Sequence, residues 1–211
     1  MKFDYIVIGA GSAGCVLSNR LSQNQNNKVA VFEAGGPSDI WKVKMPLALL
    51  YAMHDPKYNW KYYSEPEPHL NNRRLFCPRG KMIGGCSAHN GMVFVRGNKN
   101  DYERWENFGL KSWSYQKILP YFKKIENWSG GENQYRGSFG PLPINQSKNN
   151  NPLFKAFLNA ASEAGHVNNP DMNGEYQEGF GMFDTTIHNG ERASATKYYL
   201  NPIKKRKNLS I

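Results

Sequence analysis

Three glycines near the start of the chain have the spacing of a phosphate-binding turn. Gly9, Gly11 and Gly14 form G-x-G-x-x-G between the apolar run Tyr5–Ile8 and a stretch whose apolar residues recur at helical spacing. In such a turn the first glycine permits a tight bend, the second lets backbone approach a pyrophosphate, and the third lets the helix lie close to the strand. The helix N-terminus then faces the phosphate charge. This spacing predicts binding of a dinucleotide.

A carboxylate follows the second apolar run at the position that a ribose-binding acid takes. The run Val29–Phe32 ends at Glu33, which can accept hydrogen bonds from both hydroxyls of an adenosine ribose. An acid here disfavours NADP, because it would repel the ribose phosphate. The alternative is a glycine-rich turn in any α/β domain, but strand, turn, helix, second strand and terminal acid together favour the dinucleotide. These residues do not choose between FAD and NAD.

A second glycine-rich segment could also lie against a ligand. Gly80, Gly84 and Gly85 with Ser87 describe a loop whose backbone can come very near a bound molecule, and the apolar stretch 92–95 follows it. Such a loop could cradle a flat ring or a phosphate.

Several segments, in order along nearly the whole chain, resemble one family, the glucose-methanol-choline (GMC) flavoprotein oxidoreductases. The resemblance rests on F-D-Y-I-V-I-G-A-G-S-A-G with E-A-G-G, Y-N-W-K-Y-Y-S-E-P-E-P, C-P-R-G-K-M-I-G-G-C-S-A-H-N-G-M-V-F-V-R-G, D-Y-E-R-W, W-S-Y-Q-K-I-L-P-Y-F, N-P-L-F, Q-E-G-F-G and G-E-R-A-S-A-T-K-Y-Y-L-N-P.

The resemblance implies an FAD enzyme that removes a hydride from the carbon of a primary alcohol such as choline and yields an aldehyde. It implies a quinone-type chain or oxygen as the electron acceptor. Matched position by position, the residues that it implies for the pyrophosphate and the adenosine ribose are Gly9, Gly11, Ser12, Ala13, Gly14, Glu33 and Ala34. Those that it implies for the flavin side are Gly84, Gly85, Ser87, His89, Asn90, Gly91 and Val93.

His89 departs from the dehydrogenase pattern, in which an apolar residue is more usual. The run G-G-C-S-A-H-N is similar to oxidase members of the family, in which the matching histidine is joined covalently to the flavin. A neutral imidazole is a competent nucleophile near neutral pH. Two interpretations stay open: a covalent bond from His89 to FAD, or a histidine that hydrogen-bonds a neighbour or packs beside the ring.

No catalytic residue can be assigned in this chain. In the family the base that takes the alcohol proton is a histidine far downstream in a much longer chain, and none of the other four histidines here lies in that motif. We therefore expect an N-terminal part that lacks the catalytic histidine, either from an incomplete reading frame or as one half of a split enzyme. A noncatalytic flavin-binding module is a further alternative.

The formal net charge of +10 raises a second class of function, a basic protein that binds nucleic acid or anionic lipid on a repurposed fold. Most of the cations are scattered, and only residues 204–207 form a run. Because no nucleic-acid-binding motif accompanies that run, we expect no nucleic-acid partner.

The three cysteines, Cys15, Cys77 and Cys86, form no C-x-x-C pair and predict neither a disulfide framework nor a metal site. No stretch reaches the ~18 apolar residues of a membrane span, and residues 1–2 run directly into the first strand. These features predict a cytoplasmic protein. Peripheral contact with a membrane stays open, since such dehydrogenases can pass electrons to a respiratory chain.

The fold class expected is α/β: a Rossmann-like FAD-binding unit followed by the start of an α+β substrate-binding domain. We place the FAD-binding portion at residues 1–128, with a lid-like connection at 41–63, and the linker and incomplete substrate domain at 129–211. Helices are predicted over 101–108 and 114–125, with a kink or break at Pro120. A packing helix is predicted from an Asn151 cap to a Gly165 stop.

Overall fold

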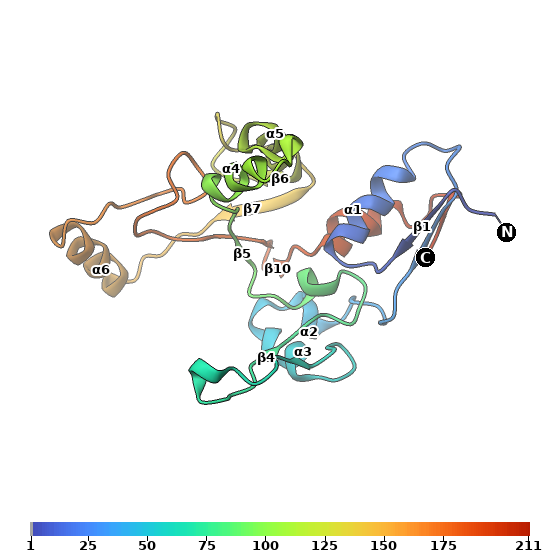
Figure 1. Cartoon of the computed structure of the whole chain (residues 1–211), viewed down its shortest axis with the longest axis horizontal. Coiled ribbons are helices and arrows are strands. Elements are labelled where there is room, and N and C mark those ends of the chain that lie inside the picture. The colour runs from blue at the N-terminus through green and yellow to red at the C-terminus, as the bar shows by residue number, and fades with distance from the viewer. Residues whose placement is uncertain (1) are drawn as a thin grey trace. The chain divides into compact units, whose positions relative to one another are not determined.

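The computed structural model describes residues 2–211, which form two compact units (Figure 1). The first unit combines residues up to Met92 with Asn189–Ile211, and the second is Val93–His188. The predicted boundary at residue 128 is one between functional domains, and it stays a prediction. The two compact units are divided at residues 92 and 189 instead, because the last residues of the chain return to the first unit.

A small parallel sheet with one crossover helix begins the first unit. Strand β1 (Tyr5–Ile8) pairs in parallel with β2 (Val29–Phe32), which also pairs with β11 (Leu209–Ser210), so that Val29 faces both Tyr5 and Leu209. Helix α1 (Ser12–Leu21) connects β1 to β2 and lies against them (Figure 1). The predicted strand, turn, helix and strand are confirmed.

The remainder of the first unit consists of short elements around a small apolar core. Val43, Tyr58, Met82 and Ala88 are its buried members, with Ile40 packed against them. The elements are α2 (Trp41–Lys44), η1 (Pro46–Ala48), α3 (Leu49–His54), the antiparallel pair β3 (Tyr62–Tyr63) and β4 (Phe76–Cys77), η2 (Pro68–Leu70), η3 (Gly85–Ala88), β10 (Glu191–Arg192), the π-helix η5 (Thr196–Leu200) and η6 (Asn201–Ile203).

The second unit is built on a mixed four-stranded sheet in the order β5-β8-β7-β6. Its elements are β5 (Val93–Phe94), α4 (Lys99–Asn107), η4 (Lys111–Trp113), α5 (Tyr115–Ile125), β6 (Glu126–Trp128), β7 (Leu142–Gln146), α6 (Pro152–Glu163), β8 (Asp184–Thr185) and β9 (Ile187–His188). Strand β7 pairs in parallel with β6 and antiparallel with β8.

Buried charges hold distant segments of the second unit together. Arg136 is fully buried, and its guanidinium pairs with Glu126 at 3.2 Å, Asp171 at 2.5 Å and Asp184 at 2.7 Å. Glu126 also pairs with buried Arg96. Each of these charges therefore has a partner of opposite sign, as buried charges require.

The predicted helices form, with two corrections. Helix α5 continues through Pro120 without a break, because Pro120 and Gln116 are both exposed and water can take the place of the missing N–H. Helix α6 has the predicted cap, in which Asn151 accepts a hydrogen bond from the Leu153 N–H at 2.9 Å. It is not a buried packing helix, since Leu153 and Phe157 are 78% and 53% exposed.

Across residues 2–211, none of the helices combines the length and apolar character needed to cross a bilayer.

Candidate dinucleotide-binding site

The first glycine turn has the geometry that its spacing predicts. Gly9 has φ +91°, in the region that favours glycine. At Gly14 an added Cβ would lie 1.9 Å from the carbonyl oxygen of Gly9, so only glycine allows α1 to approach the end of β1 this closely. Gly11 precedes the helix in an extended conformation with room for a Cβ, whose nearest neighbour would be 3.9 Å away.

The N-terminus of α1 is open for an anion. Gly11 is the N-cap and supplies no side-chain hydrogen bond, and the first turn contains no acidic residue. Ser12 and Ala13 are exposed at this end. Because the first N–H groups of a helix lack intrahelical acceptors, this turn presents donors and the positive end of the helix dipole.

Glu33 follows β2 and connects the turn to the next loop. Its carboxylate accepts hydrogen bonds from the backbone N–H of Ala10 and of Gly35, both at 2.8 Å. An ionised carboxylate has about four acceptor sites, so two stay available for hydroxyl donors. Ala34 is exposed beside it. Binding of ribose by Glu33 and Ala34 stays a prediction.

The second glycine loop meets the first one. The Gly84 N–H donates to the Ala10 carbonyl at 2.6 Å, and a Cβ at Gly85 would lie 2.8 Å from the Cα of Gly11. Gly84 and Gly85 have φ of +97° and +52°. Two loops more than 70 residues apart in sequence thus meet through glycines that carry no side chain, so a ligand at this point can contact backbone directly.

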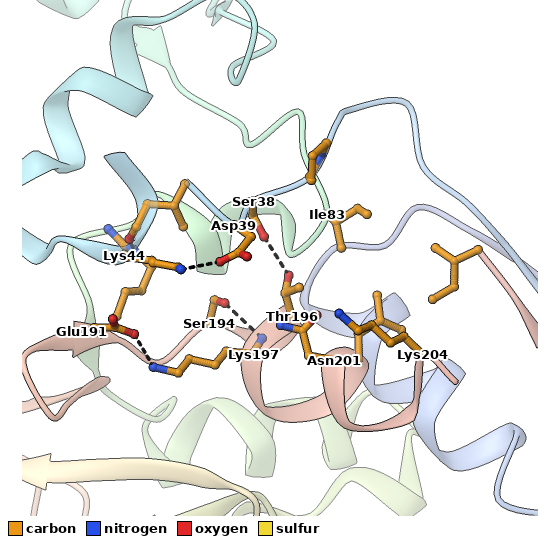
Figure 2. A pocket seen from close by; sticks show the side chains of 15 residues that line it. Ser38, Asp39, Lys44, Ile83, Glu191, Ser194, Thr196, Lys197, Asn201 and Lys204 are labelled. Atoms are coloured by element: carbon orange, nitrogen blue, oxygen red, sulfur yellow. Dashed lines mark hydrogen bonds and ion pairs between the residues drawn. The ribbon is translucent and has the colours of Figure 1, made fainter. Parts of the chain in front are cut away.

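Residues 195–196, late in the chain, contact the second loop and support it. Ser87 Oγ donates to the Gly84 carbonyl at 2.7 Å and accepts from the Ala195 N–H at 3.0 Å. Thr196 Oγ1 lies where a Cβ at Gly84 would stand, 2.3 Å away, and contacts Ser38 Oγ at 3.3 Å (Figure 2). Neither Ala195 nor Thr196 was predicted as a site residue, because their one signal in the sequence is their place in the G-E-R-A-S-A-T run.

A pocket of about 380 Å³ lies beside this supporting segment (Figure 2). Both acidic side chains of its lining are paired: Lys44 bonds to Asp39 and Lys197 bonds to Glu191, each at 2.6 Å. Among the described residues that line the pocket, no acidic side chain is therefore left unpaired to recognise a cation.

His89 is the most unusual side chain of the second loop. It is 2% exposed, and neither ring nitrogen has a hydrogen-bond partner among the described residues. Burial lowers the pKa of His89, and the positive charge of Arg192 adds to that shift. Backbone atoms of His89 and Arg79 lie near the ring without hydrogen-bond geometry and offset the shift only in part. The ring is therefore neutral at pH 7, with an imidazole lone pair that no protein donor occupies.

The other predicted flavin-side residues lie on or after this loop. Asn90 and Gly91 are exposed at its end, and Val93, 49% exposed, begins β5 of the second unit. Two of the remaining histidines have other contacts: His54 bonds to the Leu50 carbonyl at 2.9 Å, and His166 packs against an aromatic ring.

FAD fits the residues present. A cradle that any Cβ at Gly85 would fill and an uncapped helix N-terminus are what a pyrophosphate requires of a protein. Beside them, both ring nitrogens of buried His89 lack a hydrogen-bond partner in the described part of the chain. Within residues 2–211, no group of three or more His, Cys, Asp or Glu side chains is arranged to hold a metal ion.

Comparison with known proteins gives concordant matches. The family model described as GMC oxidoreductase matches residues 3–211. An oxygen-dependent choline dehydrogenase of Sinorhizobium fredii is 50% identical over 211 residues, which are 100% of this chain and 38% of that protein. The mitochondrial choline dehydrogenase of Mus musculus is 46% identical, over 99% of this chain and 36% of its own length.

Solved structures agree with these relatives. The pyridoxine 4-oxidase from Mesorbium loti matches with a TM-score of 0.94 and 30% identity, over 100% of this chain and 42% of its own. An FAD-dependent oxidoreductase from Chaetomium thermophilum matches with a TM-score of 0.88 and 28% identity, over 100% and 38%. The chain thus spans about 38% of the length of the curated relatives that it matches.

Proposed function

Because the chain belongs to the GMC oxidoreductase family, we propose that its two glycine loops hold FAD in an enzyme that oxidises a primary alcohol, with choline as the first candidate substrate. When bound, FAD would accept the hydride from the alcohol carbon, which becomes an aldehyde. The electrons would then pass to oxygen or to a quinone-type acceptor. Cytoplasmic location and peripheral contact with a membrane stay predictions.

One observation carries the proposal: the backbones of Gly11 and Gly85 meet at the open N-terminus of α1. A pyrophosphate at this point would accept N–H donors from the helix, while the rest of the cofactor could follow either loop. In this assignment Glu33 and Ala34 lie at the ribose end, and Ser87, Asn90, Gly91 and Val93 lie at the flavin end.

The role of His89 has two forms within this proposal. In one, the neutral imidazole nitrogen bonds covalently to the flavin; in the other, the ring packs beside it. Burial and the absence of a protein partner for either nitrogen support a nucleophile. Acid precipitation of FAD-loaded protein separates the two: flavin that stays with the washed precipitate, and is released in His89→Ala, supports the covalent bond.

We assign the base that takes the alcohol proton to none of the histidines described here. The proposal for this chain is therefore FAD binding without alcohol turnover, and turnover in the presence of the remaining length that the relatives possess. This is the behaviour of one part of a larger or divided enzyme.

Titration of the purified chain with FAD, followed by flavin fluorescence, tests the proposal. Wild type is expected to bind one equivalent. Gly11→Ala should weaken binding at least tenfold without changing the melting temperature, because the added Cβ meets protein only at 3.9 Å but would occupy space that the proposal gives to the pyrophosphate. Gly36→Ala is the matched control, since its Cβ would meet nothing within 4 Å.

Failure of wild type to bind FAD would overturn the assignment. Salt-sensitive binding of nucleic acid or anionic lipid in its place would favour the basic binding protein instead.

A further inference from the structure

Arg192 is a buried cation whose contacts converge on the second glycine loop. It is 2% exposed and lies on β10. Its Nε donates to the Val43 carbonyl at 3.0 Å, and its Nη1 donates to the carbonyl and to the side-chain Oδ1 of Asn90 at 2.7 and 2.9 Å. One guanidinium thus joins α2 to the loop residue that follows His89.

This guanidinium has no acidic partner among the described residues. Its neighbour Glu191 is paired with Lys197 at 2.6 Å (Figure 2), and Nη2 of Arg192 is buried without any hydrogen-bond partner. Desolvation lowers the pKa of Arg192 to about 10, which still leaves it charged at neutral pH. A buried, uncompensated charge is unfavourable for folding. The charge therefore does not serve general stability, and its hydrogen bonds to Val43 and Asn90 indicate a local role.

The backbone that Arg192 holds is strained. Met92 has φ +59°, which is uncommon for a residue other than glycine, and its N–H donates to Asn90 Oδ1 at 3.1 Å. The Asn90 side chain therefore connects Arg192 to the left-handed turn at Met92. At its other end the loop is fixed by two hydrogen bonds, from the Gly84 N–H to the Ala10 carbonyl and from the Ala195 N–H to Ser87 Oγ. The side chain of Arg192 fixes the end at Asn90.

We propose that Arg192 is a positioning residue that fixes this loop at Asn90, so that His89, Asn90 and Gly91 are preorganised for the ligand. Two different nitrogens of the guanidinium reach two segments, Nε the Val43 carbonyl and Nη1 Asn90, and the single nitrogen of a lysine ammonium cannot reproduce that geometry. The identity of the ligand as FAD rests on the proposed function. The proposal that Arg192 fixes the loop does not depend on that function.

The first test needs no cofactor. Diethyl pyrocarbonate modifies neutral imidazoles, and site-resolved mass spectrometry of the full chain would compare buried His89 with exposed His69 as the internal standard. Arg192→Met and Arg192→Lys should both raise the His89 rate at least fivefold relative to His69. Lys197→Met, which removes a cation of the same segment that forms only a partly exposed ion pair, should leave it unchanged.

Chemical rescue distinguishes positioning from a general structural role. In Arg192→Ala, millimolar guanidinium chloride should return the His89 rate towards that of wild type, whereas sodium chloride at equal ionic strength should not. Amide hydrogen exchange of the full chain shows whether a variant has merely folded poorly. Faster exchange confined to residues 84–92 supports the proposal. Faster exchange throughout the first unit, or wild-type exchange and modification rates in all Arg192 variants, would overturn it.

The second test uses FAD. If wild type binds FAD, both Arg192→Met and Arg192→Lys should raise the dissociation constant at least tenfold, and Lys197→Met should not. If wild type binds no FAD, the proposed function fails, while the modification and rescue results still decide the role of Arg192. If all variants bind FAD as wild type does, Arg192 does not position the loop for this ligand.

Discussion

The absence of a Cβ atom at two glycines allows the first turn to form and the two loops to meet. The close approach of α1 to β1 depends on the missing side chain at Gly14, and the meeting of the two loops depends on the missing one at Gly85. The tight bend at Gly9 and the close packing at Gly14 could be predicted from sequence, because each acts within its own turn. The role of Arg192 could not, because its acceptors Val43 and Asn90 lie about 100 residues or more away and are brought to it only by the fold.

Gly14→Ala should lower the free energy of unfolding of the first unit by at least about 2 kcal/mol, because the new Cβ would overlap the Gly9 carbonyl oxygen and push α1 from the sheet. Chemical denaturation measures the change. Gly36→Ala, with open space at its Cβ, should unfold like wild type. Equal stability of the Gly14 variant would show that α1 does not pack as described.

Cys15 should be unreactive and should make stability depend on alkaline pH. It is fully buried, its Sγ donates to the Ala10 carbonyl at 3.2 Å, and burial raises its pKa from 9.0 to about 11. Below pH 9 the thiol is protonated in both states and stability is unaffected. Between pH 9 and 11 the unfolded chain releases a proton that the native protein keeps, so stability falls by about 1.4 kcal/mol per pH unit.

Two measurements check this. Iodoacetamide at pH 8 should label the partly exposed Cys77 and Cys86 and leave Cys15 unlabelled until denaturant is added. Denaturation from pH 8 to 11 should show a smaller loss of stability for Cys15→Ala than for wild type. Rapid labelling of native Cys15 would contradict the burial.

Among the elements, those with local signals were predictable and those without were not. The apolar runs and the glycine turn predicted β1, α1 and β2, and Asn151 with Pro152 predicted the start of α6. The two-residue strands have no periodicity of their own, since they exist only through pairing with distant segments. The exposure of α6 was missed because a stripe of apolar residues does not reveal what covers it.

The sheet of the second unit should depend strongly on Glu126. Its fully buried carboxylate bonds to Arg96, Arg136 and the Gly137 N–H. Glu126→Gln would leave the buried guanidinium of Arg96 without its acidic partner, while Arg136 would keep Asp171 and Asp184. We expect the unfolding free energy of this unit to fall by about 3 kcal/mol. Denaturation followed by tryptophan fluorescence would measure it.

The control for Glu126 is Glu103→Gln, which breaks the exposed pair with Lys99 on α4 and should cause no measurable change. Similar effects of the two substitutions would show that the buried network does not stabilise the unit.

At the scale of the whole molecule, the first unit carries an uncovered apolar face. Helix α1 covers the side of the sheet formed by Val7 and Val31, both buried. On the other side, Ile6, Ile8 and Phe32 are 61%, 80% and 58% exposed, and Ile8 and Phe32 are direct neighbours in the register. Contiguous apolar surface of this kind favours association.

Replacing Ile6, Ile8 and Phe32 together by threonine should at least halve the binding of the dye 8-anilinonaphthalene-1-sulfonate without lowering the melting temperature, since these side chains bury little area. Val31→Thr, on the covered side, should lower the melting temperature instead. Unchanged dye binding in the triple variant would mean that another surface dominates.

The return of the chain to β2 at Leu209 has a consequence for biosynthesis. Strands β1 and β2 can pair as soon as about 30 residues have left the ribosome, but the third strand and the segment that supports the second glycine loop are made only after the entire second unit. Contacts at such sequence separation form late. A nascent chain therefore carries an unfinished cradle until the whole second unit has been made, which favours chaperone engagement during that interval.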